Sequence, residues 1–279
     1  MYNEFENREG GIFMISVKNL FDNDDVKIID RKGNISVVEF QRDVSVNKLT
    51  AMSEYFAAKM NVRRRQVVIQ LQGDEYVTSS GAMQWMAGNI ESKTNVKGVG
   101  DFLGKAIKGS VTSESTVKPK YHGTGLLALE PTYNYILLED VGAWNGSMVL
   151  EDGLFLACEA SLNTNVVMRS NLSSAVLGGE GLFNLKLSGQ GIAVLESPVP
   201  REELIEIELQ NDQIKIDGNM AIAWSDTLDF TVEKSTRSLL GSAVAGEGFV
   251  NVYRGTGKIL MSPVRPEAVS NIMTYRPKQ

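Results

Sequence analysis

A glycine–x–glycine triplet occurs three times in this chain at a constant spacing of 66 residues. The triplets are Gly123-Thr124-Gly125, Gly189-Gln190-Gly191 and Gly255-Thr256-Gly257. Each triplet is followed by a short apolar run that ends close to a proline. A fixed period of this length is typical of a chain built from copies of one structural unit. The sequence therefore predicts three tandem repeats.

The repeated unit has the pattern of β-structure. Apolar and polar residues alternate strictly through Ile205, Ile207 and Leu209, and again through Phe230 and Val232. A period of two places one row of side chains inward and the next outward, as in a half-buried strand. Because a 66-residue sandwich buries little apolar area alone, the units should pack on one another. We predict an all-β fold of three β-sandwich repeats in a pseudo-threefold arrangement.

Glycines are expected to provide the chain reversals between these strands. The triplet glycines are predicted to be structural turns, because glycine takes positive φ angles without strain. Asp152-Gly153 and Asp217-Gly218 are typical of hairpin turns, and Gly73-Asp74 stands at the corresponding place in the first copy. None of the triplets has the third glycine of a dinucleotide-binding loop, so no nucleotide site is predicted.

An N-terminal extension precedes the repeats. Within it Val46, Leu49, Met52, Phe56 and Met60 fall on one helical face, behind Ser45 as a capping residue. We expect this helix to pack on the sandwich surface; the alternative is a partner-binding helix. The predicted divisions are an extension (1–62), repeat 1 (63–132) with a helical insertion near 101–116, repeat 2 (133–199), repeat 3 (200–265) and a C-terminal tail (266–279).

Composition excludes several classes of site. The chain has one cysteine (Cys158) and one histidine (His122), too few for a disulfide framework, a multi-cysteine metal site or the histidine cluster of a cupin-like enzyme. We therefore predict no catalytic residues, no metal and no cofactor. Cys158 lies in an apolar run and is expected to be buried and inert, and His122 to lie at the surface. Since no apolar run approaches the roughly 18–20 residues that cross a bilayer, no transmembrane segment is predicted, and a reducing, cytoplasmic location is the simplest interpretation.

Arg63, Arg64 and Arg65 form the one dense basic cluster. In a ring-shaped assembly, such a segment would track the backbone of an RNA strand. The formal charge of −6 and the presence of the cluster in a single repeat argue against this. A linker or interface role is the preferred interpretation.

Several motifs occur together in a recognisable order. They are Ser79 to Asn89, Phe102-Leu103-Gly104, Gly178 to Phe183, Gly189-Gln190-Gly191 and Ser225 to Phe230. The set resembles the altered inheritance of mitochondria protein 24 family over roughly residues 65–265. The resemblance implies three fused domains similar to the trp RNA-binding attenuation protein. It also implies chains that trimerise into nine-domain rings, and an association of the mitochondrial branch with inner-membrane organisation. Residues 1–62 are an addition to the usual family core.

These observations favour a non-enzymatic scaffold or binding protein that assembles with itself, most simply as a homotrimer. The alternative is a ring that binds RNA or a small ligand between adjacent units, by analogy with the attenuation protein. A cupin-like enzyme is the third class. The sequence does not identify a protein partner.

Overall fold

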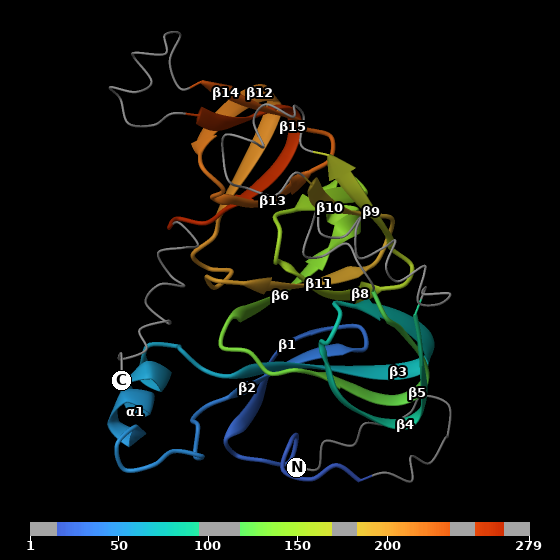
Figure 1. Cartoon of the computed structure of the whole chain (residues 1–279), viewed down its shortest axis with the longest axis vertical. Helices are drawn as coiled ribbons and strands as arrows, with labels where there is room; N and C mark the ends of the chain where they lie inside the picture. Colours follow the sequence, from blue (N-terminus) through green and yellow to red (C-terminus); the bar gives the residue numbers. More distant parts are fainter. Residues whose placement is uncertain (1–15, 95–117, 169–182, 235–248, 265–279) are drawn as a thin grey trace, which may run out of the picture.

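The fold is built almost entirely of β-strands. The computed structural model describes residues 16–94, 118–168, 183–234 and 249–264, and these contain one α-helix, α1 (Ala51–Lys59), near the N-terminus. The strands form two sheets that follow one another along the long axis of the molecule, with β1–β5 and α1 at one end and β12–β15 at the other (Figure 1). The predictions of an all-β chain and of a helix in its N-terminal extension are confirmed.

The first sheet contains eight strands, which are β1 to β6 together with β8 and β11 from the second half of the chain. Its main path runs in the order β1-β2-β3-β8-β11-β6, and β5 pairs with both β3 and β4. All of its pairings are antiparallel. The strands are β1 (Val26–Lys32), β2 (Ile35–Phe40), β3 (Arg65–Thr78), β4 (Met83–Lys93), β5 (Lys120–Leu129), β6 (Tyr135–Asp140), β8 (Phe155–Glu159) and β11 (Ile192–Ser197).

This sheet curls into a nearly closed barrel, because β6 at one end of the path returns towards β1 at the other. There the ammonium group of Lys32 on β1 donates a hydrogen bond to the carbonyl oxygen of Leu138 on β6, at 2.7 Å. Apolar side chains from the curled strands meet in one buried cluster that includes Val37, Ile69, Leu127, Leu138 and Val194.

The second sheet contains seven strands from the second half of the chain. Its order is β12-β15-β13-β7-β10-β9, with β14 paired to β15. A short 3-10 helix, η1 (Val141–Trp144), leads from β6 in the first sheet to β7 in the second. The strands are β7 (Ser147–Leu150), β9 (Asn163–Met168), β10 (Phe183–Ser188), β12 (Ile205–Asp217), β13 (Ala221–Ser225), β14 (Asp229–Lys234) and β15 (Phe249–Met261).

An apolar cluster joins the two sheets, and we call it the sheet junction. Its buried side chains come from β6, β8 and β11 of the first sheet and from β7, β10, β13 and β15 of the second. Trp144 of η1 lies in the same cluster. The junction includes Leu137, Phe155, Leu195, Met148, Leu150, Leu187, Ile222 and Leu260.

The glycine triplets do not all act as turns, and this corrects the prediction. Gly123 and Gly125 lie within β5, and Gly255 and Gly257 lie within β15, where the strands continue without reversing. Only the triplet from Gly189 to Gly191 separates two strands, β10 and β11. The first and third triplets face register shifts in the paired strands, between residues 72 and 75 of β3 and residues 209 and 212 of β12. These triplets therefore lie within continuous strands, opposite an irregularity in the paired strand, and do not form turns.

Close backbone approach is one reason for glycine at these positions. Gly125 has a φ of +153°, and a β-carbon on it would lie 2.1 Å from the carbonyl oxygen of Ala87 on β4. Gly73-Asp74 is likewise part of the β3 bulge rather than the predicted hairpin turn. Turns occur at the predicted Asp152-Gly153 and Asp217-Gly218, but they are not hairpins: β7 and β8 belong to different sheets, and β12 and β13 each pair with β15 rather than with one another.

Helix α1 lies where the sequence predicts it, but its apolar face is turned to the solvent and does not pack on the sheets. Its N-terminal capping position is Thr50 rather than Ser45, and none of its residues is buried. Leu49, Met52, Phe56 and Met60 are 93%, 73%, 60% and 76% exposed. The expected packing of this apolar face on the sandwich is therefore wrong. The spacing of residues identifies a shared face, but it does not say which way that face is turned.

Several predictions fall outside the described residues or stay untested. The helical insertion near 101–116 and the tail at 266–279 lie outside the described ranges. The number of repeats, their boundaries and their pseudo-threefold relation stay predictions. In the part of the chain that the structure describes, no helix has the length and apolar character needed to cross a membrane.

Candidate functional site

The arginine cluster lies where the N-terminal extension joins the first sheet. Arg63 and Arg64 follow α1, and Arg65 begins β3. Strand β3 pairs with β2 of the extension in a register that sets Arg65 directly opposite Glu39. The predicted linker segment is therefore also the place where charges of opposite sign meet.

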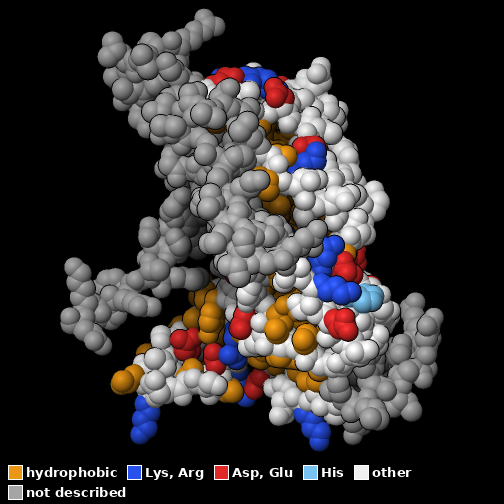
Figure 2. Space-filling model, turned by 45° about the vertical axis from the view of Figure 1, so that its right-hand side comes forward, with side chains coloured by type: hydrophobic (Ala, Val, Ile, Leu, Met, Phe, Trp, Pro, Cys, Tyr) orange, Lys and Arg blue, Asp and Glu red, His pale blue; other side chains and the backbone are white. Residues whose placement is uncertain are grey.

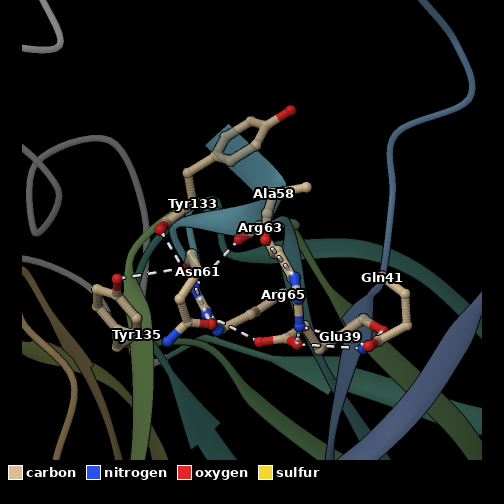
Figure 3. A network of polar contacts seen from close by, with 8 residues as sticks. All are labelled: Glu39, Gln41, Ala58, Asn61, Arg63, Arg65, Tyr133 and Tyr135. Atoms are coloured by element: carbon tan, nitrogen blue, oxygen red, sulfur yellow. Dashed lines mark hydrogen bonds and ion pairs between the residues drawn. The ribbon is translucent and has the colours of Figure 1, made fainter. Parts of the chain in front are cut away.

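Arg65 is a buried cation, with only 2% of its surface exposed. One of its terminal nitrogens lies 2.8 Å from Oε2 of Glu39 and also donates hydrogen bonds to the backbone oxygen and Oδ1 of Asn61 (Figure 3). Its other terminal nitrogen donates to the backbone oxygen of Arg63 at 3.1 Å. The guanidinium carbon lies 4.2 Å from the centre of the Tyr135 ring. Ionic, hydrogen-bonding and aromatic partners therefore surround the group.

Arg63 reaches the same carboxylate from the other side. Its Nη1 lies 2.8 Å from Oε1 of Glu39, and its Nε donates a hydrogen bond of 3.0 Å to the backbone oxygen of Ala58 in α1 (Figure 3). Glu39 is 5% exposed, so one buried carboxylate receives two guanidinium groups. We call Glu39, Asn61, Arg63 and Arg65 the arginine clamp. It holds the C-terminal end of α1 to the sheet through the backbone oxygens of Ala58 and Asn61.

Arg64 points to the opposite side of the segment. Its guanidinium carbon lies 4.3 Å from the centre of the Phe40 ring, and Nη2 lies 3.9 Å from Oδ1 of Asp43. The Tyr133 hydroxyl donates a hydrogen bond to the other Asp43 oxygen at 3.1 Å. Partial burial and the neighbouring Asp43 carboxylate together raise the pKa of Tyr133. These contacts tie the loop before α1 to the segment that follows β5.

An open groove of about 420 Å³ lies between α1 and residues 41–46. Arg42, Asp43, Glu54, Lys59 and Arg63 line it. The lining also includes Val44, Val46, Ala51, Tyr55, Ala58 and Gln41. The groove thus has mixed charge and stands on the body side of the helix.

Two of the three guanidinium groups of the cluster, those of Arg63 and Arg65, are paired with Glu39 within the protein. Removing one member of a buried ion pair is strongly destabilising, because the remaining charge stays buried without its partner. Arg63 and Arg65 are therefore tied to the fold. The hypothesis that all three arginines track RNA stays a prediction, and within it Arg64 is the side chain that does not contact Glu39.

The two residues that most often carry chemistry lie away from the clamp. Cys158 is fully buried on β8, and burial raises the pKa of its thiol to about 12, which keeps it protonated and weakly nucleophilic. His122 is exposed on β5, with Nδ1 3.2 Å from the backbone oxygen of Asp74. Both placements agree with the sequence-based expectation. Within the described residues, no group of three His, Cys, Asp or Glu side chains is arranged to hold a metal ion.

Comparison with known proteins places the family core after the extension. The model of the family described as mitochondrial biogenesis AIM24 matches residues 59–264, which is most of the chain.

The chain belongs to the AIM24 family.

A solved structure, that of protein SPYM3_0169 from Streptococcus pyogenes, is 25% identical to this chain in sequence. It has a TM-score of 0.57 and covers 77% of this chain and 94% of its own. No curated protein matches the sequence. The AIM24 match begins at residue 59, so Arg63, Arg64 and Arg65 lie inside the family region whereas Glu39 lies outside it. The predicted family resemblance is confirmed.

Sequence reasoning found the arginines but missed their partner. Glu39 is the one acidic residue in the apolar run from Ile35 to Phe40, and that is a signal of a buried charge with an ionic partner. Its partners became clear only from the β2–β3 register.

Proposed function

We propose that this AIM24 protein is a non-enzymatic scaffold that assembles with itself through open sheet edges. The observation that carries the proposal is the presence of two long strands with one partner each. Among the described residues, β4 pairs only with β5, and β12 pairs only with β15. An unpaired edge presents a row of N–H and C=O groups that another chain can extend. Strands of 11 and 13 residues offer long edges of this kind.

The proposed building unit is a β-repeat present in three copies. Its support is a backbone hydrogen bond that recurs at the same place after each triplet. The bond runs from Glu130 N to Ala82 O at 2.7 Å, from Glu196 N to Leu154 O at 2.8 Å and from Ser262 N to Met220 O at 2.7 Å. The donors are 66 residues apart, as the triplets are.

A second recurring contact supports the same unit. A β-carbon on Gly191 would lie 3.2 Å from Leu162, and one on Gly257 would lie 3.0 Å from Leu228. In each case a leucine, which follows a hydrogen-bonded turn, fills the space above a triplet glycine. Similar units favour assembly, because their strand edges have similar geometry. An edge that stays open in one chain can then pair with an edge of another chain.

A scaffold role fits the chemistry of the candidate residues. The Cys158 thiol is buried and protonated, and the Glu39 carboxylate is occupied by two guanidinium groups. Each group supports the fold instead of facing an accessible reaction site.

Mass measurement with parallel ultraviolet absorbance tests the proposal. Size-exclusion chromatography with light scattering should give about 92 kDa, three times the 30.6 kDa chain mass, without excess absorbance at 260 nm. Amides on the outer edges of β4 and β12 should exchange hydrogen more slowly as protein concentration rises. A monomer at all concentrations would overturn the proposal, and co-eluting nucleic acid would favour the RNA-binding ring instead.

A further inference from the structure

The apolar side chains around α1 form an outward stripe with no cover in the described structure. Leu49, Met52, Phe56 and Met60 are spaced by three or four residues, which places them along one side of a helix. All four are more than half exposed, and the neighbouring Tyr55 is 58% exposed. We call these five residues the α1 stripe. Exposed patches of this kind mark interaction sites.

The helix contacts the body through the side opposite the stripe, so the large apolar side chains lie on the exposed side. The more sheltered positions are Glu54, Ala57 and Ala58. The backbone N–H of Val62 donates to the oxygen of Ala57 at 2.9 Å, and Arg63 donates to the oxygen of Ala58. The arginine clamp therefore fixes a helix that shows small residues to the protein and large apolar residues to the solvent.

Lysines border the stripe at both ends. Lys48 and Lys59 are exposed, and the Nζ of Lys59 lies 5.4 Å from the centre of the Tyr55 ring. Glu54, the one acidic residue of α1, lines the groove between α1 and residues 41–46, and Tyr55 and Lys59 stand at the edge of the same groove. Figure 2 shows hydrophobic side chains at the lower end of the molecule, with basic and acidic side chains among them. A stripe with a positive border fits a surface that is apolar inside and anionic outside.

The distribution of charge along the chain also favours an orientation with the α1 end towards an anionic surface. Residues 1–65 contain eleven Lys and Arg against ten Asp and Glu, a net charge of +1, whereas residues 66–279 carry a net charge of −7. An anionic surface would therefore repel the rest of the molecule more than the α1 end. Helix α1 projects sideways near the lower end of the molecule and lies to one side of the first sheet (Figure 1).

A second copy of the chain fits this stripe less well. A stable interface buries about 800 Å² on each partner. A nine-residue helix is only about 14 Å long at 1.5 Å per residue, and a pair of such helices buries much less than that area. An antiparallel pair would also bring Lys48 of one copy near Lys59 of the other, and like charges repel.

We propose that α1 is a docking element for an anionic lipid surface, and that it lies in the interface with the α1 stripe among the acyl chains and Lys48 and Lys59 among the headgroups. The strength of binding at a lipid interface scales with the apolar area that is buried and with the attraction of basic side chains to anionic lipids. Most of this helix precedes the region that matches the AIM24 family, so the inference concerns a feature of the extension. It also stands apart from the proposed self-assembly, since α1 is not part of the β4 or β12 edge.

Vesicle sedimentation with the full-length chain tests the proposal. The probes are vesicles of phosphatidylglycerol and phosphatidylcholine in equal parts, and vesicles of phosphatidylcholine alone. We expect the wild type to sediment with the anionic vesicles and much less with the neutral ones. A double variant, M52S with F56S, should weaken binding by at least about tenfold, since each side chain loses its transfer energy. The variants K48E and K59E should each weaken binding to anionic vesicles by about fivefold or more.

Matched controls keep the result interpretable. I29S and M86S remove apolar side chains that are exposed on β1 and β4, and both should bind as the wild type does. F56L keeps the apolar surface and should keep binding, and circular dichroism should show that every variant is folded. Wild-type protein that stays in solution with anionic vesicles would overturn the proposal, as would equal losses in M86S and in the double variant M52S with F56S. A concentration-dependent dimer abolished by that double variant would assign the stripe to a second copy instead.

Discussion

The two junctions of this molecule are built in opposite ways. At the extension, a buried carboxylate and two guanidinium groups hold a helix whose apolar side chains stay in solvent. At the sheet junction, apolar side chains fill the interior, and the ion pairs of Arg201 with Glu139 and Glu206 lie nearer the surface. Apolar burial tolerates many geometries, whereas a buried ion pair needs all its partners in place. The difference indicates that the sheet junction supplies stability and the arginine clamp fixes the orientation of α1.

The same substitution in the two regions should separate these roles most strongly. Leu150 is fully buried in the sheet junction, and L150A should lower the free energy of unfolding by about 3–5 kcal/mol because it leaves a cavity. Leu49 is 93% exposed, and L49A should change it by less than about 0.5 kcal/mol. Urea denaturation of both variants is the measurement. Similar losses in the two variants would mean that Leu49 is packed.

The charged junction should respond next most strongly, to loss of its shared carboxylate. E39Q leaves Arg65 buried without its ionic partner, and we expect the free energy of unfolding to fall by about 3 kcal/mol. E206Q removes a carboxylate from a more exposed pair with Arg201, so it should cost less than about 1 kcal/mol. Chemical denaturation compares the two variants. If E39Q were as mild as E206Q, the clamp would not be a structural element.

Within the first sheet, glycine substitutions should distinguish close packing from turn geometry. G125A would place a β-carbon against the Ala87 carbonyl oxygen, whereas G153A meets no atom within 4 Å. Both glycines have positive φ, so both substitutions are strained. The clash should make G125A less stable than G153A by about 2 kcal/mol, within the range for strained or overpacked sites. Equal melting temperatures for the two variants would contradict this account of the triplets.

The smallest effect should be the pH dependence of stability that comes from the ion pair between Arg201 and Glu206, near the surface of the sheet junction. The Arg201 guanidinium donates to Glu206 and holds the pKa of that carboxyl below its usual value. A carboxyl with a lowered folded-state pKa stabilises the fold fully above its unfolded pKa of about 4.3 and loses that effect as pH falls through the folded pKa. Wild-type protein should thus lose stability below about pH 4.3 more steeply than E206Q does. Parallel slopes in acid titrations of the two proteins would count against the pair.

The sequence predicted the strands better than it predicted the junctions. Alternation through Ile205, Ile207 and Leu209 identified β12, because a strand with one buried face has a period of two in its own sequence. The spacing of Leu49, Met52 and Phe56 identified a helical face by the same logic. Whether that face is covered depends on what the rest of the fold provides, and no local pattern contains that information.

The clamp was less accessible to prediction for a related reason. The pairing of Glu39 with Arg65 depends on the register between β2 and β3, which the helix separates in the chain. The triplet glycines were recognised as a repeat, but their roles differ because two of them lie opposite bulges and one separates strands. A bulge depends on the partner strand, and short-range sequence patterns describe one strand at a time.

The central claim is that the arginine clamp holds α1 with its apolar stripe in solvent. Methionine oxidation by dilute peroxide, followed by peptide mass spectrometry, tests it most directly in dilute lipid-free protein. Met52 and Met60 lie on the stripe, and Met148 is fully buried in the sheet junction. The account predicts rapid oxidation of Met52 and Met60 and slow oxidation of Met148. Protection of Met52 and Met60 equal to that of Met148 would mean that the helix is turned inward, and would contradict it.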